Sequence, residues 1–306
     1  MSGNQDSSQH IPVAGVLLLV LLSFLWGANM VSIKFSNQGI PPILAAFVRS
    51  IISSFLLWIY ARMVGEKVFL PKGLVRHGVV IGLLFGAEFL CLYWGVKFTD
   101  ASRVVIFLYT HPLLVAVMAH FLLMDDRLHM AKGAGVCVAF VGLVLVFGSR
   151  SVTVGPDHWV GDVMELIAGL LWALTTIYVK KFIWNTPITH FQTLFAQLFF
   201  SIPVLAAGTL LFEWGWNIDL TTPVLAALFY QSVIVAFASY LAWFWLIHRY
   251  QVSRLAAFTF LTPLFGVILS GVVLGEALTL VLWVGLALVA AGIYLVNRPQ
   301  ANAGTG

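Results

Sequence analysis

The sequence alternates long apolar runs with short polar connections. Apolar runs of roughly 18 to 25 residues recur between Ile11 and Val296, and each is long enough to cross a hydrocarbon core about 30 Å thick. Backbone N–H and C=O groups in lipid must be hydrogen-bonded within the protein, so such runs predict helices. Strands of a membrane barrel would alternate apolar and polar residues over about ten positions, and the sequence has no such alternation.

This pattern predicts an all-α membrane protein with ten transmembrane helices. The expected spans cover residues 13–35, 43–64, 77–97, 103–123, 132–148, 161–182, 188–211, 223–247, 255–274 and 281–297. Their connections are too short to hold a soluble domain. The first run is not expected to be a cleaved signal. No basic region precedes it, and Trp26, Asn29 and Lys34 follow it in place of a small-residue cleavage pattern.

The composition agrees with a bilayer environment. Hydrophobic residues make up 61% of the chain and charged residues only 9%, whereas soluble domains carry about 25% charged residues. The net charge of +4 is therefore interpreted as a topology signal, and no nucleic-acid partner is expected. Cys91 and Cys137 fall within predicted spans, where cysteine behaves as a small apolar residue.

The basic residues of the short loops predict the orientation, because cytoplasmic loops are enriched in Lys and Arg. With the N-terminus in the cytoplasm, eleven basic residues lie inside: Arg62, Lys67, Lys72, Arg76, Arg127, Lys132, Lys180, Lys181, Arg249, Arg254 and Arg298. Only four lie outside: Lys34, Lys97, Arg103 and Arg150. We therefore predict a multi-pass protein of a bacterial inner membrane, with cytoplasmic tails at residues 1–12 and 298–306.

The two halves of the chain share a sequence pattern. The matched positions are Trp26 with Trp172, Lys34 with Lys180, Trp94 with Trp245, Ser102 with Ser253, Arg103 with Arg254, Pro112 with Pro263, Gly135 with Gly285, and Gly142 with Gly292. They predict repeats at residues 13–150 and 157–297. Each repeat holds five spans, an odd number, so the second should enter the membrane from the opposite side. Inverted repeats are common in secondary transporters, whose substrate site lies near the bilayer midplane.

These residues resemble a known family. Trp26-Gly27, Arg49 and Pro112 in the first half, and the sequence LTPLFGVILSGVVLGEALT from Leu261 in the second, are similar to the EamA repeat of the drug/metabolite transporter superfamily. The first half departs from that pattern at residues 124–126 (MDD), where a Gly-Glu turn is expected. Within the superfamily, Glu88 together with residues 108–112 (LYTHP) most resembles the aromatic amino acid exporters. The resemblance implies export, a direction that the sequence itself does not encode.

Two prolines interrupt the fourth and ninth spans at matching positions. Proline lacks an N–H and clashes with the carbonyl four residues earlier. Pro112 is therefore predicted to free the carbonyl of Leu108, and Pro263 that of Thr259. A packing kink repaired by a neighbouring helix is the alternative for either proline. Their matched positions favour two hinges that face one central cavity.

Three polar residues inside the spans are candidates for the site. Glu88 lies near the middle of the third span, where a charge costs roughly 2.5–3.5 kcal/mol. It could bind a substrate ammonium or carry a proton; the structural alternatives are an ion pair with Arg49 or a hydrogen bond to His111. His111 could bind a carboxylate or titrate near neutrality, or be structural. Arg49 could hold a carboxylate, but snorkelling or a fold-stabilising pair is favoured.

Aromatic and small polar residues complete the predicted site. Trp26 and Trp172 lie too deep for an interfacial belt, and as repeat mates they are expected to line the cavity. Further predicted contacts are Tyr109, Tyr240 and Phe260 for ring surface, and Asn29, Thr175, Thr176 and Ser239 for polar contact. Packing in the core is the alternative for each of them.

The predicted function is secondary transport that exports amino acids, above all aromatic and other large neutral ones. Glu88 and the freed carbonyls would bind the ammonium, His111 or the hydroxyls the carboxylate, and the rings the side chain. A multidrug or organic-cation exporter is the alternative and would need no carboxylate contact. A non-transporting receptor or scaffold is a further alternative.

No enzymatic activity, metal or cofactor is expected, since the sequence has no HExxH, GxSxG or P-loop motif. Without an ATP-binding motif, a gradient must drive transport, and proton coupling stays open. We expect a monomer. Gly82 with Gly86, and Gly271 with Gly275, have the small-xxx-small spacing of close helix packing, which we assign to contacts within the chain rather than to dimerisation.

Overall fold

The computed structural model describes residues 11–149, 155–183, 186–274 and 278–298, and these residues form helices and loops without strands. Most of both predicted tails, Arg150, and Gly275-Glu276 of the family-like turn lie outside the described residues. Within them, ten helical segments are long and apolar enough to cross a membrane. The predicted all-α membrane fold is therefore confirmed.

Six of the ten spans are formed by one α-helix, which in the third span is preceded by the short helix η1. They are α1 (Val13–Ser36), α2 (Pro42–Met63), η1 and α3 (Lys72–Leu74 and Val75–Gly95), α6 (Met130–Gly148), α8 (His190–Phe212) and α13 (Leu280–Asn297). The other four are composite: α4 and α5 (Ala101–Leu108 and His111–Leu122), α7 and η2 (His158–Tyr178 and Val179–Ile183), α9, η3 and α10 (Thr222–Phe229, Tyr230–Ser239 and Tyr240–Ile247), and α11 and α12 (Val252–Phe258 and Leu261–Leu274). The largest boundary difference is at the third span, which was predicted from residue 77 and begins at Lys72.

The fourth and ninth spans are broken rather than kinked. α4 ends at Leu108 and α5 begins at His111, which places Pro112 in the first turn of α5. In the same way, α12 begins at Leu261, two residues before Pro263. The first turn of a helix has N–H groups without helical partners, so a proline there removes no helical bond. Each proline therefore starts a new helix in the middle of the membrane.

The two carbonyls that the prolines were expected to free differ in their surroundings. The Thr259 carbonyl accepts a hydrogen bond from the Thr262 N–H at 3.0 Å, so the prediction of a free carbonyl there is wrong: a tight turn at the helix break supplies the donor. The Leu108 carbonyl faces α7, where a methyl group on Gly169 would lie 2.6 Å from its oxygen.

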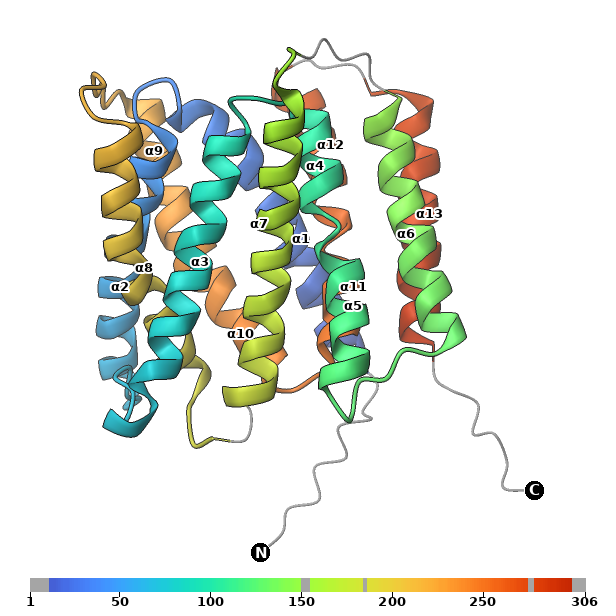
Figure 1. Cartoon of the computed structure of the whole chain (residues 1–306), viewed down its shortest axis with the longest axis horizontal. Helices are drawn as coiled ribbons and strands as arrows, with labels where there is room; N and C mark the ends of the chain where they lie inside the picture. The colour runs from blue at the N-terminus through green and yellow to red at the C-terminus, as the bar shows by residue number, and fades with distance from the viewer. Residues whose placement is uncertain (1–10, 150–154, 184–185, 275–277, 299–306) are drawn as a thin grey trace, which may run out of the picture.

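Helices of one half pack mainly on helices of the other half. α1 packs along α12, and its counterpart α7 packs along α4 and α5 (Figure 1). The pairs α3 with α8 and η3 with α2 correspond in the same way. If each span is replaced by its counterpart in the other half, the contact between α1 and α12 becomes that of α7 with α4 and α5, and the contact between α3 and α8 becomes that of η3 with α2. A two-fold relation between the halves requires this correspondence. The packing is consistent with the predicted inverted repeat.

The last span of each half forms a separate pair at one edge of the molecule, where α6 and α13 stand side by side (Figure 1). A Cβ on Gly135 would lie 2.7 Å from the Gly292 carbonyl oxygen, and one on Gly142 would lie 2.8 Å from that of Gly285. Gly135 matches Gly285 and Gly142 matches Gly292 in the repeat, so the two contacts are equivalent by the two-fold relation. Glycine lets the two backbones touch, which is how helices associate where no hydrophobic effect drives them together.

Glycines also bring α3 close to α8. A Cβ on Gly82 would lie 2.3 Å from the Phe200 Cβ, and one on Gly86 would lie 2.7 Å from the Val204 Cβ. The expected close packing of Gly82 and Gly86 within the chain is confirmed. These contacts fix α3, the helix that carries Glu88, against the second half of the protein.

Gly142→Ala should destabilise the protein, because the added methyl group has no room between the α6 and α13 backbones. Overpacking of this kind costs typically about 1–3 kcal/mol. Gly133→Ala, on the same helix, is the matched control, since its nearest atom would lie 3.9 Å away. Thermal unfolding in detergent compares the two. A Gly142→Ala variant as stable as Gly133→Ala would contradict the assignment of this contact.

Candidate functional site

A cavity of about 170 Å³ lies at the centre of the bundle. Among the described residues, every span except α6 and α13 contributes to its lining. Both halves of the chain therefore build one chamber, as the repeat predicted. The α6–α13 pair stands apart from it.

Most of the predicted contact residues meet at this cavity. Those that line it are Trp26, Asn29, Glu88, Tyr109, Trp172, Thr175, Thr176 and Tyr240. They come from α1, α3, the break between α4 and α5, α7 and α10. The two tryptophans that match between the halves thus face the same space from opposite halves.

Three predicted contacts lie behind the lining instead. His111 is fully buried, and its ring stacks on Trp172 with centroids 3.9 Å apart and planes 10° apart. Ser239 accepts a hydrogen bond from Trp26 Nε1 at 2.9 Å. Phe260 is fully buried and its ring lies 6.3 Å from that of Phe140. His111 and Ser239 thus support the two cavity tryptophans, so their predicted direct contact with substrate is not what the geometry favours.

The two prolines predicted as hinges are both buried. Pro112 follows His111 in the first turn of α5, and Pro263 lies one residue beyond the lining residue Thr262. Both helix breaks therefore occur at the depth of the cavity. Motion about the prolines stays a prediction.

Glu88 and Arg49 put opposite charges into the same chamber. Glu88 is 7% exposed and Arg49 1%. Among the described residues, no ion pair within 4.0 Å joins them, and neither nitrogen of the His111 ring has a hydrogen-bond partner. Both structural alternatives for Glu88 are therefore absent from this structure. The carboxylate remains available to a ligand.

Arg49 does not snorkel as the sequence analysis favoured. Snorkelling would expose the guanidinium, yet the side chain is buried, lines the cavity and packs with Cζ 4.5 Å above the Phe89 ring. Its Nε and Nη2 atoms have no hydrogen-bond partner among the described residues. In the second half of the sequence, the repeat pattern places Gln197 opposite Arg49, and this polar residue lines the same cavity.

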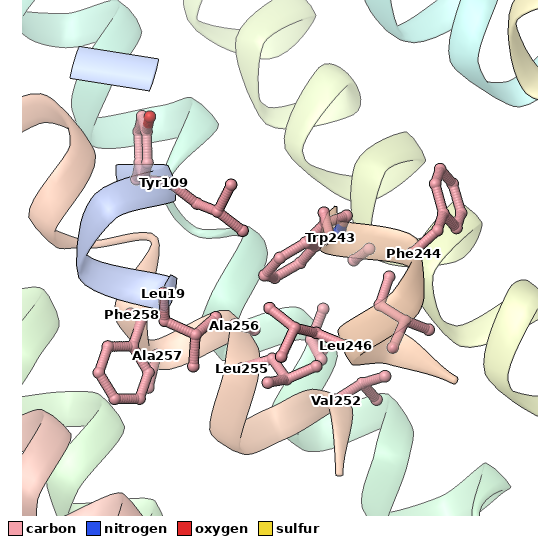
Figure 2. Close-up of a cluster of buried hydrophobic side chains, with 14 of the residues drawn as sticks. Leu19, Tyr109, Trp243, Phe244, Leu246, Val252, Leu255, Ala256, Ala257 and Phe258 are labelled. Carbon is pink, nitrogen blue, oxygen red and sulfur yellow. The ribbon is translucent and has the colours of Figure 1, made fainter. Parts of the chain in front are cut away.

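One end of the cavity is closed by packed apolar side chains. Val179 and Ile247 of the lining are each 1% exposed. Figure 2 shows Leu246 of α10 beside Leu255 of α11, and both side chains are fully buried. Beyond them, Lys180 Nζ donates to the Tyr250 carbonyl at 2.9 Å.

The opposite end of the cavity is less covered. The lining residues Asn29, Met30 and Ile33, which follow one another along the last turns of α1, are all partly exposed. The cavity therefore opens toward the membrane face at which α1 ends.

A buried polar cluster holds the closed end together. Asp126 Oδ1 accepts a hydrogen bond from Lys132 Nζ at 2.6 Å, and Asp126 Oδ2 accepts one from the Ser253 N–H at 2.9 Å. The aspartate thus binds the first turn of α11, where N–H groups lack helical partners. This explains why the first half has Asp126 in the turn that departs from the family pattern.

A ten-span helical membrane protein with a central polar and aromatic chamber, open to one face, has the architecture of a solute transporter. The model of the EamA-like transporter family matches residues 13–148 and again residues 159–298. The chain belongs to this family, and it is a multi-pass membrane transporter.

Relatives match over nearly the whole chain. A probable amino-acid metabolite efflux pump of Salmonella typhimurium is 29% identical, over 91% of this chain and 93% of its own. The protein of that name in Escherichia coli is 27% identical, over 92% and 93%. The uncharacterized transporter YoaV of Bacillus subtilis is 22% identical, over 92% and 95%. A protein of known crystal structure, 20% identical, shares the fold with a TM-score of 0.77 over 92% of this chain and 96% of its own.

Cysteine labelling should show which end of the cavity is open. Cys91→Ala and Cys137→Ala first remove both native thiols. In that background, Ile33→Cys should react with a membrane-impermeant maleimide in proteoliposomes, because Ile33 lies at the uncovered end. Val179→Cys, at the packed end, should react much more slowly from either side. Equal labelling rates for the two variants would contradict the closed end described above.

Proposed function

We propose that this protein exports amino acids, preferentially aromatic and other large neutral ones, by alternating access through the central cavity. The observation that carries the proposal is a pair of buried opposite charges, Arg49 and Glu88, in a chamber walled by aromatic rings; among the described residues, neither has an ion pair within 4.0 Å. An amino acid brings one group of each sign, so its binding would neutralise both side chains at once.

Each part of such a substrate has a partner in the cavity. The Arg49 guanidinium would bind the carboxylate, for which its planar array of donors is suited. Glu88 would bind the ammonium. Arg49 thereby takes the role that the sequence analysis gave to His111. An aromatic side chain would pack on the rings of Trp26, Trp172 and Tyr240 in edge-to-face or offset geometry.

The comparisons support amino acids as the substrate class, since two relatives are named as probable amino-acid metabolite efflux pumps. The resemblance of Glu88 and of residues 108–112 to the aromatic amino acid exporter YddG supports the preference for large side chains.

If the termini are cytoplasmic, as the loop charges predict, the open end of the cavity faces outward. Alternating access would then close that end and open the packed one, with the breaks beside Pro112 and Pro263 as hinges.

Loss of the Glu88 carboxylate or of the ring wall should abolish uptake of radiolabelled aromatic amino acids into proteoliposomes. Glu88→Gln removes the partner of the ammonium, and Trp172→Ala removes both the ring wall and the support on His111. Glu66→Gln is the control, because this carboxylate is exposed in the loop after α2. All three should insert and purify normally. Wild-type rates in Glu88→Gln and Trp172→Ala would refute the assigned site.

Competition by amines should separate amino acid transport from organic-cation transport. Phenylalanine should compete better than phenethylamine, which lacks the carboxylate. A hydrogen bond to a charged group contributes about 1.5–3 kcal/mol, which corresponds to about a tenfold to hundredfold difference in apparent affinity. Arg49→Gln should remove this difference. Equal competition by the two compounds in the wild type would instead identify an organic-cation exporter.

A further inference from the structure

A second carboxylic acid is buried in the membrane-spanning part, outside the cavity lining. Glu165 of α7 is fully buried, and neither of its carboxyl oxygens has a hydrogen-bond partner among the described residues. It points at α3, where a Cβ on Gly95 would lie 2.7 Å from Glu165 Oε1. The absence of a side chain at Gly95 therefore makes the space that the carboxyl group occupies.

Among the described residues, no cation forms an ion pair with this carboxyl group within 4.0 Å. One turn earlier on α7, Asp162 is paired with Arg103 of α4, through a hydrogen bond of 3.0 Å from Nε and a shorter contact from Nη2. Thr99 also donates to Asp162, at 2.8 Å. The nearby guanidinium is thus already bound to another carboxylate.

Among the described residues, the other titratable groups near Glu165 offer no positive charge. α3 presents Cys91, and Asp162 of α7 is bound to Arg103. A metal ion is not favoured either, because no group of three or more His, Cys, Asp or Glu side chains gathers among the described residues. An isolated carboxylate is costly inside a membrane, and the one cation that fits without further ligands is a proton.

The position of Glu165 relates it to the transport site. Seven residues separate Glu165 from Trp172 on α7, and seven separate Gly95 from Glu88 on the antiparallel helix α3. Seven residues are about two helical turns, or about 10 Å along the axis, and return to the same helix face. Glu165 therefore lies about 10 Å from the level of Glu88, toward the face where the cavity opens. Cys91 lies between them on α3.

We propose that Glu165 is a proton-binding site that couples transport to a proton gradient. The carboxylate takes up one proton from the face at which the cavity opens, becoming a neutral carboxyl group. It releases that proton when the contact between α3 and α7 opens during the cycle, and the amino acid moves in the opposite direction. This inference rests on the proposed amino acid transport and adds the group that carries the proton.

Proteoliposomes with an internal pH dye would test the coupling. Wild-type protein should move protons when an aromatic amino acid is added. Glu165→Gln, which has the shape of the protonated acid, should lose this proton movement and the stimulation by a pH gradient. It should retain exchange of labelled for unlabelled amino acid, which needs no net proton movement. Glu165→Asp should restore the proton movement, and Glu66→Gln should behave as the wild type.

The outcomes separate this inference from the proposed function. Amino acid transport without proton movement in the wild type, or proton movement retained in Glu165→Gln, overturns the role of Glu165 and leaves amino acid transport standing. If the wild type moves no amino acid, the proposed function fails, and infrared spectra then decide on the proton site. A protonated-carboxyl band that titrates in the wild type and is missing in Glu165→Gln supports proton binding. Identical spectra overturn it.

Discussion

A polar group inside a bilayer must be hydrogen-bonded, neutralised or turned toward water, and this constraint organises the protein. The backbone meets it by forming helices, which is why ten apolar segments span the membrane. Where helices break, at residues 109–110 and 259–260, neighbouring groups take over. Thr110 Oγ1 donates to the Phe107 carbonyl at 2.7 Å, and Ser23 Oγ donates to the Phe258 carbonyl at 3.0 Å. The breaks are possible because other side chains and helices cover them.

The same constraint separates two classes of buried charge. Asp126 and Lys132 at the closed end are paired and hydrogen-bonded, so they stabilise a local structure. Arg49, Glu88 and Glu165 are buried and, among the described residues, have no ion pair within 4.0 Å. Ionisable residues of this kind in membrane spans typically serve a function. The distinction between the two classes underlies both the transport site and the proton site proposed here.

Close packing by glycine provides the frame in which these groups are held. The α6–α13 pair contacts through Gly135, Gly142, Gly285 and Gly292 and contributes nothing to the cavity. The remaining spans can therefore surround the chamber while this pair joins the two halves at one edge. The helix breaks lie beside the chamber, and the backbone contacts through these glycines lie away from it.

The sequence by itself determined the membrane environment, the number of spans and the repeat pattern. The lengths of the apolar runs and matched residues such as Trp26 and Trp172 can be read directly from the chain. It also predicted Glu88, since a carboxylate in an apolar run is conspicuous. Only the tertiary structure decided which side chains meet. Arg49 near a helix start can either snorkel or be buried, and His111 can either face a cavity or support a ring. Glu165, near the start of its span, shows its isolation only once α3 and α4 are packed against α7 and Arg103 is seen bound to Asp162. Local sequence sets the helices, but the partners of a buried charge are set by helices far apart in the chain.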